Sequence, residues 1–201
     1  MKLPVPFYQQ TTKLNCGPAA LRMVLAYFGD DTDLKVIEER SGIKEGKAVS
    51  TIELAIAAAS LGYGADFFSK SIFFNQENAK MDFYKNYADL DLEVSKKLVE
   101  KANKHGVKVE ETTLSLNNLL SLFTKDSLLI VLLDWNVIKG NKEGGYQGHF
   151  VPVIGYDEKS VFVHNHGLTN PKESMIIQRA LFDMARKAKG TDEDILVVHR
   201  K

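Results

Sequence analysis

The chain has 201 residues, 44% of them hydrophobic and 26% charged, so we expect one domain, or one domain with two lobes, around a sizeable core. Its 26 Lys and Arg residues are balanced by 26 Asp and Glu residues, which argues against nucleic acid or an anionic membrane as a partner. A single cysteine excludes an internal disulfide, and no apolar run is long enough for a signal peptide or a membrane span, so the prediction is a cytoplasmic protein. The sequence leaves the oligomeric state open.

The first predicted helix begins at the only cysteine. Residues 3–10 are expected to be extended, because the two prolines in this segment disfavour a helix. Pro18 suits a first helical turn, where its missing N–H costs nothing. Apolar residues then recur three and four positions apart as far as Phe28, and Gly29 provides a left-handed stop. The sequence therefore predicts a helix with Cys16 at its start.

Cys16 is the candidate nucleophile. A helix N-terminus has a positive dipole end and unpaired N–H groups, which lower the pKa of a thiol and favour the thiolate. The alternative is a small buried apolar residue, as most free cysteines are. Gln10, six residues upstream, favours the first interpretation. Its amide can donate a hydrogen bond to a substrate carbonyl that becomes an oxyanion, with the Cys16 N–H as the second donor.

Two more short helices complete a predicted helical lobe over residues 11–62. They are expected over residues 34–40, capped by Asp33, and over residues 51–61, where Ser50 and Glu53 form a capping box. Residues 64–113 are expected to be an insertion packed on the side of the sheet. Its predicted elements are a strand followed by an aromatic loop over 65–74, a helix over 93–104 and an exposed strand over 107–110.

The last part of the chain predicts a β lobe over residues 127–199. Residues 128–133 form a continuous apolar run, which is typical of a strand covered on both faces. The other predicted elements are a helix over 116–123, strands over 149–156, 160–165 and 195–199, and a helix over 181–187. The expected fold class is α+β, with the helical lobe packed against an antiparallel sheet in a single domain, residues 1–201.

The hairpin over residues 149–165 carries the other two candidate catalytic residues. Folding it about its turn brings His149 and Asn165 close together, and their even spacing allows both side chains to share one face. His149 is then the candidate base for Cys16, and Asn165 would hold the ring in its tautomer. A histidine at a strand start is often an ordinary structural residue. His164 and His166 are expected to face the opposite side and, with His199, to be structural.

The motif Gln-x5-Cys-Gly-Pro-Ala-Ala-Leu-x-Met, which starts at Gln10, resembles the papain-like cysteine peptidases and most closely their C39-like branch. Residues 83–85, 118–133, 146–150 and above all Gly-Thr-Asp-Glu-Asp-Ile over residues 190–195 resemble the guanylylate cyclase family. This likeness covers residues 4 to 199. The resemblance implies the papain-like (cysteine proteinase) fold, and an asparagine as third triad residue agrees with papain and with this family.

The first functional hypothesis is a cysteine peptidase-like hydrolase or acyl transferase. It would act on a peptide, isopeptide or amide, with Cys16, His149, Asn165 and Gln10 as catalytic residues and no cofactor or metal. The sequence does not identify the substrate.

The family's name implies a second hypothesis, conversion of GTP to cyclic GMP. A cyclase must bind a triphosphate and normally uses a divalent metal. The sequence contains no Gly-rich phosphate loop, and its only compact acidic cluster, residues 192–194, fits a solvated turn better than a metal site. A third hypothesis is a protein that retains the triad but works by binding.

Overall fold

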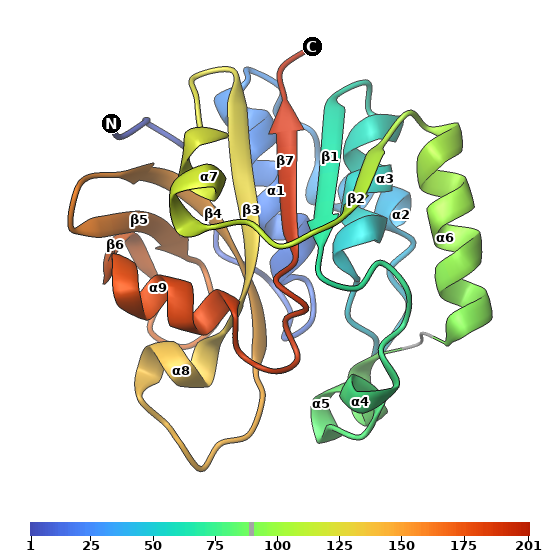
Figure 1. Ribbon diagram of the computed structural model, residues 1–201. Coiled ribbons are helices and arrows are strands. Elements are labelled where there is room, and N and C mark those ends of the chain that lie inside the picture. Colours follow the sequence, from blue (N-terminus) through green and yellow to red (C-terminus); the bar gives the residue numbers. More distant parts are fainter. Residues whose placement is uncertain (89–90) are drawn as a thin grey trace.

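The computed structural model describes residues 1–88 and 91–201, which form a seven-stranded sheet with helices on both faces (Figure 1). The strands are β1 (Gly64–Ser69), β2 (Lys108–Glu111), β3 (Ser127–Asp134), β4 (Gly148–Tyr156), β5 (Ser160–Asn165), β6 (Lys172–Gln178) and β7 (Ile195–His199). Their order across the sheet is β2-β1-β7-β3-β4-β5-β6. Neighbouring strands are antiparallel except β1 and β2, which are parallel.

Helices pack on both faces of the sheet. The helices of the described residues are α1 (Cys16–Tyr27), α2 (Leu34–Ser41), α3 (Thr51–Ser60), α4 (Gln76–Ala79), α5 (Asp82–Tyr87), α6 (Leu92–Lys104), α7 (Leu116–Ser121), α8 (Trp135–Lys139) and α9 (Arg179–Arg186). Helices α1, α2 and α3 pack on one another, and α1 and α3 cover one face of the sheet (Figure 1). Helix α9 packs on β3, β5 and β6 from the other face. None of the described helices is both long and apolar enough to cross a lipid bilayer.

The three helices predicted within residues 11–62 are present as α1, α2 and α3. In α1, the periodic apolar residues Leu21, Val24 and Leu25 are all fully buried. In α3, the capping box between Ser50 and Glu53 is present, with 2.7 Å from the Ser50 N–H to the carboxylate. The two helices approach closely because the second residue of α1, Gly17, has no side chain. A Cβ there would lie 2.8 Å from Leu54 Cδ1. The N-terminus of α1 is thus held against α3.

The sheet differs from its prediction in extent. Strand β3 is buried on both faces along residues 128–133, as its continuous apolar sequence predicts. However, the sheet extends beyond the predicted β lobe over residues 127–199 and contains one parallel pair. Strand β1 pairs with β7, and β2 pairs with β1 in the parallel direction, so residues 64–113 contribute two strands. These pairings join segments that are distant in sequence, which local patterns do not report. The division of the chain into lobes and an insertion stays a prediction.

Candidate active site

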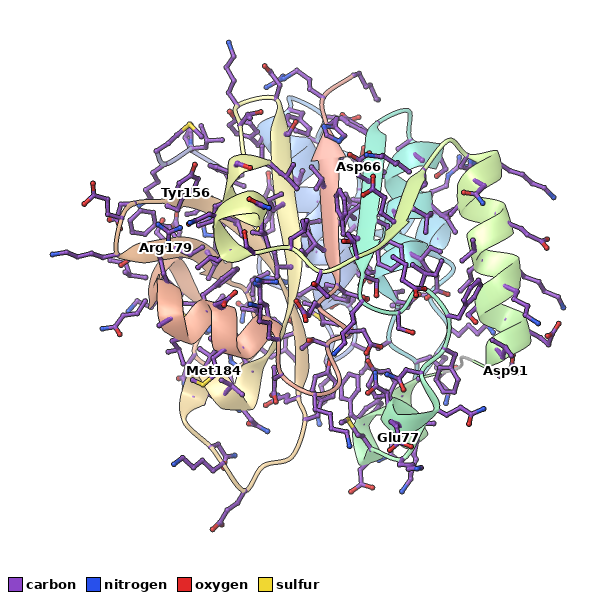
Figure 2. All side chains as sticks on the ribbon, viewed as in Figure 1. Asp66, Glu77, Asp91, Tyr156, Arg179 and Met184 are labelled. Carbon is purple, nitrogen blue, oxygen red and sulfur yellow. The ribbon has the colours of Figure 1, made fainter. Side chains whose placement is uncertain are left out.

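The predicted catalytic residues come from elements that meet at one end of the sheet. Cys16 is the first residue of α1, His149 is the second residue of β4 and Asn165 is the last residue of β5. Helices α4 and α5 lie at this end, where Figure 2 labels Glu77. Asp66, also labelled in Figure 2, lies toward the other end, and its carboxylate is 3.1 Å from His199 Nε2. His199 therefore lies away from the predicted triad.

A β-bulge sets the relative positions of His149 and Asn165. Next to the turn, Tyr156 pairs with Val161, but further along Val153 pairs with Val163, so the register shifts by one residue between them. If this shifted register continues by two residues, Asn165 lies opposite Val151, which is two positions from His149 along β4 and therefore on the same face of the sheet. Without the bulge, the two side chains would lie on opposite faces.

Cys16 lies beside the strand that carries His149, because Cys16 lines one cavity with Gly148 and Phe150. Hydrogen bonding from the backbone N–H groups of Phe150, Gly17 and Cys16 itself acts to lower the pKa of the thiol. Burial nevertheless raises the pKa of the thiol, because the loss of hydration outweighs these N–H groups. This direction is opposite to the one expected from the helix N-terminus, so the prediction of a lowered thiol pKa is wrong. The thiol is protonated in the free protein at neutral pH.

Alkylation of Cys16 tests this protonation state. With iodoacetamide, we expect slow labelling of the folded protein near neutral pH and a rise with pH that is centred above the ordinary thiol value of 9.0, because only the thiolate reacts. The control is the same profile in urea, where the only cysteine of the chain titrates as an exposed thiol. A folded profile that lies on the acid side of the urea profile would contradict the assignment.

His149 is buried and neutral in this environment. Burial lowers its pKa well below the ordinary value, the neighbouring His166 acts in the same direction, and hydrogen bonding with Asn165 opposes both. The ring packs against the edge of Trp135, with 4.8 Å between centroids. Its Nε2 atom is buried and lacks a hydrogen-bond partner among the described residues. A neutral buried imidazole with a free nitrogen can accept a proton from a neighbouring thiol.

Asn165 is fixed by the loop that follows β5. Its Nδ2 donates to the Asn170 carbonyl at 2.8 Å, and its Oδ1 accepts from the Gly167 N–H at 3.3 Å. A Cβ on Gly167 would lie 3.3 Å from Asn165 Oδ1 and 4.0 Å from His149 Cε1, so the two side chains are neighbours, and hydrogen bonding with Asn165 acts to raise the pKa of His149. Such bonds are often long in the absence of substrate.

His166 is a neighbour of the site that the sequence did not predict. Its ring centroid lies 5.0 Å from that of His149, and its Nε2 is 2.8 Å from the Cys16 carbonyl oxygen. Burial lowers the pKa of His166 to about 4, so the ring is neutral. The expectation that His166 faces the opposite side from Asn165 is wrong. Strand β5 ends at Asn165, so the alternation of side chains between the two faces does not extend to His166. His164 packs on Phe7 and lies 2.9 Å from the Val5 carbonyl.

Gln10 lies in the loop before α1, but its amide is turned toward its own backbone. Its Nε2 donates to the Thr12 carbonyl at 2.7 Å, while the backbone N–H donates to the His166 carbonyl at 2.9 Å. Asn15 stabilises this loop by accepting from two backbone N–H groups. The predicted oxyanion donor must therefore rotate away from Thr12 before its Nε2 can donate to a substrate.

A cavity of about 110 Å³ lies beside the Cys16 thiol. Its walls are largely aromatic and aliphatic, and its polar lining includes Tyr84, Tyr146, Asp192 and Asp194. Sequence reasoning treated the two aspartates as a solvated turn, but both are partly or largely buried here, and burial raises the pKa of each. In the described residues, no group of three or more His, Cys, Asp or Glu side chains could hold a metal ion. Together, the thiol, the neutral base and the cavity provide the parts needed for nucleophilic attack on a bound carbonyl.

Solved structures of peptidases share this fold. A double glycine motif protease from an AMS/PCAT transporter, solved with its leader peptide, has a TM-score of 0.55 and 17% identity and covers 100% of this chain and 94% of its own. The peptidase domain of Streptococcus ComA has a TM-score of 0.54, 12% identity and coverages of 98% and 99%. A C39-like peptidase from Bacillus anthracis has a TM-score of 0.56, 14% identity and coverages of 100% and 98%. The fold is thus the papain-like fold of the C39 peptidases.

Sequence comparison identifies the family. Guanylyl cyclase 1 of Arabidopsis thaliana is 24% identical over 213 residues, which span 98% of this chain and 76% of that protein. The sequence profile described as guanylylate cyclase matches residues 5–198, from the segment before Gln10 to the last strand. Because this match takes in nearly the whole chain and every residue of the candidate site, the chain belongs to the guanylylate cyclase family.

Proposed function

We propose that the protein is a cysteine-dependent hydrolase or acyl transferase that acts on a peptide, isopeptide or amide bond. The observation that carries this proposal is that Cys16, at the start of α1, lines one cavity with Gly148 and Phe150, the residues on either side of His149 in β4. The shared fold with peptidases, one of them solved with a peptide bound, supports a peptide-like substrate. The catalytic residues are Cys16, His149, Asn165 and Gln10.

The proton starts on the thiol in this mechanism. As the Cys16 sulfur attacks the substrate carbonyl carbon, its proton passes to neutral His149, and the carbonyl oxygen becomes an oxyanion. The Cys16 N–H and the rotated Gln10 amide donate hydrogen bonds to that oxyanion. When the bond to nitrogen breaks, His149 returns the proton to the leaving amine, which leaves a thioester. Water or a second amine then attacks the thioester, and His149 takes a proton from the attacking group. The bond between the carbonyl carbon and the Cys16 sulfur breaks, His149 returns the proton to the sulfur, and the acid or the new amide leaves.

The test is turnover by wild-type protein and the Cys16→Ala variant against a library of peptides, isopeptides and amides. We expect the wild type to release amine from some members and the variant to release none above background, because the nucleophile is missing. Thermal unfolding of the variant checks that its fold is retained. Turnover that survives Cys16→Ala would refute the proposal.

The names of the family and of the Arabidopsis relative favour one alternative, the conversion of GTP to cyclic GMP. A surface hollow of about 350 Å³ beside residues 190–193 is lined by three lysines, which could attract phosphate. Three carboxylates also line it, however, and Lys187 is already paired with Asp183 at 3.0 Å. The same preparations should therefore be assayed with GTP and magnesium or manganese. Cyclic GMP formation that survives Cys16→Ala and is lost in Asp192→Asn would establish the cyclase instead.

A further inference from the structure

Two unsatisfied buried polar atoms belong to residues that line the cavity beside Cys16. In the described part of the chain, five buried side-chain atoms have no hydrogen-bond partner. Two of them, Gln10 Oε1 and His149 Nε2, belong to proposed catalytic residues. Two others, the Tyr146 hydroxyl and Asp194 Oδ1, belong to residues that line the cavity and have no part in the mechanism above. Buried polar groups are normally hydrogen-bonded, so these two atoms require an explanation.

The carboxylate of Asp194 is only half satisfied. Its Oδ2 accepts a hydrogen bond from the Thr51 hydroxyl at 2.6 Å, whereas its Oδ1 is the buried atom without a partner. The Ser69 hydroxyl also acts to lower the pKa of Asp194, but it donates its proton to the Ser71 carbonyl at 2.9 Å. The neighbouring Asp192 differs, because each of its oxygens accepts from an asparagine amide, at 3.2 Å from Asn75 and 2.7 Å from Asn78. A buried carboxylate oxygen is costly unless a donor reaches it, so Asp194 leaves one acceptor position open to a ligand.

The Tyr146 hydroxyl lies beside β4, the strand that carries His149, and Tyr146 lines the same cavity as Asp194. A Cβ on Gly148, the residue before His149, would lie 2.7 Å from the hydroxyl oxygen, so the hydroxyl reaches back to β4. The Tyr146 ring stacks on Tyr84, whose own hydroxyl donates to the Gly190 carbonyl at 2.6 Å. Burial raises the pKa of Tyr146 well above its ordinary value, so the group remains a neutral hydroxyl. It therefore offers a second acceptor oxygen.

The cavity is acidic, and its length fits a long side chain. Among the described residues that line it, two are aspartates and none is Lys or Arg. The Asp194 carbonyl accepts from the Leu132 N–H at 3.2 Å. Leu132 pairs with Phe150, which lines the cavity together with Cys16. Asp194 is thus two strand spacings from Phe150, or roughly 10 Å. An extended lysine side chain spans roughly 6 Å from Cα to Nζ, and its carbonyl carbon adds about 1.5 Å more.

We propose that this cavity is the specificity pocket of the proposed hydrolase and takes a primary ammonium group on an alkyl stem, as in a lysine side chain of the substrate. The aromatic and aliphatic walls pack against the stem, Asp194 is the counter-ion, and the Tyr146 hydroxyl accepts a second hydrogen bond. The placement of the scissile bond rests on the proposed function. Binding of the ammonium group does not, because Cys16 takes no part in it.

The test is a calorimetric titration of the Cys16→Ala protein with Nα-acetyl-lysine N-methylamide and with the uncharged norleucine analogue. We expect the lysine compound to bind at least about tenfold more tightly, since its ammonium adds charge-assisted hydrogen bonds. Adding Asp194→Asn should reduce that preference to about twofold or less. Adding Asp126→Asn, which removes one negative charge at the exposed start of β3, should leave the preference unchanged.

A second variant protects the test against loss of folding. Tyr146→Phe keeps the ring that stacks on Tyr84 and removes only the hydroxyl, so it should change stability little, but it should weaken lysine binding about fivefold. Equal affinity for norleucine, a preference that survives Asp194→Asn, or no saturable binding of the lysine compound would each overturn the specificity pocket. None of these results bears on whether Cys16 is a nucleophile, which the turnover assay decides separately.

Discussion

Replacing His149 with alanine is expected to lower kcat/KM for any amide that the wild type cleaves by about 10²- to 10⁴-fold, the usual contribution of a positioned acid–base group. The thiol of this protein is protonated at neutral pH, because burial raises its pKa. Without a neighbouring acceptor, it would have to ionise into water before attacking. The loss should therefore appear mainly in kcat, and it should shrink as the pH rises and hydroxide removes the thiol proton. Steady-state kinetics over a range of pH values measure both effects.

The matched control is His105→Ala, which replaces an exposed histidine at the C-terminal end of α6 and should leave kcat/KM unchanged. A His149→Ala variant within about tenfold of the wild type at neutral pH would remove His149 from the mechanism. Equal losses at all pH values would indicate a role in positioning instead of proton transfer.

The fold could be predicted where local sequence decides it. Amphipathic spacing and caps define α1, α2, α3 and α6, and each begins and ends within one or two residues of its predicted limits. Strand β6 was missed because it is an edge strand with exposed residues such as Ile176 and no regular alternation. The short helix α8 was also missed. The joining of β1 to β7 depends on long-range pairing, which no local pattern encodes.

The candidate site could be predicted as a set of residues but not as an environment. The order of Gln10, Cys16, His149 and Asn165 in the chain carried the prediction. Their surroundings did not follow from it, because burial reverses the expected pKa shift of Cys16 and a one-residue bulge in β4 decides whether two of the side chains share a face. The cavity and its free carboxylate oxygen combine residues from distant segments, so only the three-dimensional structure reveals them.

The largest loss of stability is expected from Arg186→Met. Arg186 is fully buried in α9, where its guanidinium contacts Asp183 at 2.6 Å, Glu193 at 3.4 Å and the Leu114 carbonyl at 2.7 Å. Methionine has a similar length but no charge, so it leaves the largely buried Glu193 carboxylate without its ion pair and leaves Asp183 with Lys187 alone. We expect the free energy of unfolding to fall by about 3 kcal/mol, the lower end for breaking a buried ion pair, because Asp183 keeps some contact with water.

Urea unfolding at neutral pH measures this loss, and Arg186→Lys is the matched control. Lysine keeps the positive charge but lacks the planar fork that reaches both carboxylates and the Leu114 carbonyl. Arg186→Lys should therefore lower the free energy of unfolding by about half as much as Arg186→Met. The Thr191 hydroxyl donates to the Arg186 carbonyl at 2.6 Å, which ties α9 to the segment carrying Asp194. The methionine variant should therefore also weaken lysine binding in the cavity, even where it remains folded. An unchanged free energy of unfolding in Arg186→Met would mean that loss of the ion pairs to Asp183 and Glu193 does not destabilise the fold. These ion pairs would then have no part in holding Asp194 in place.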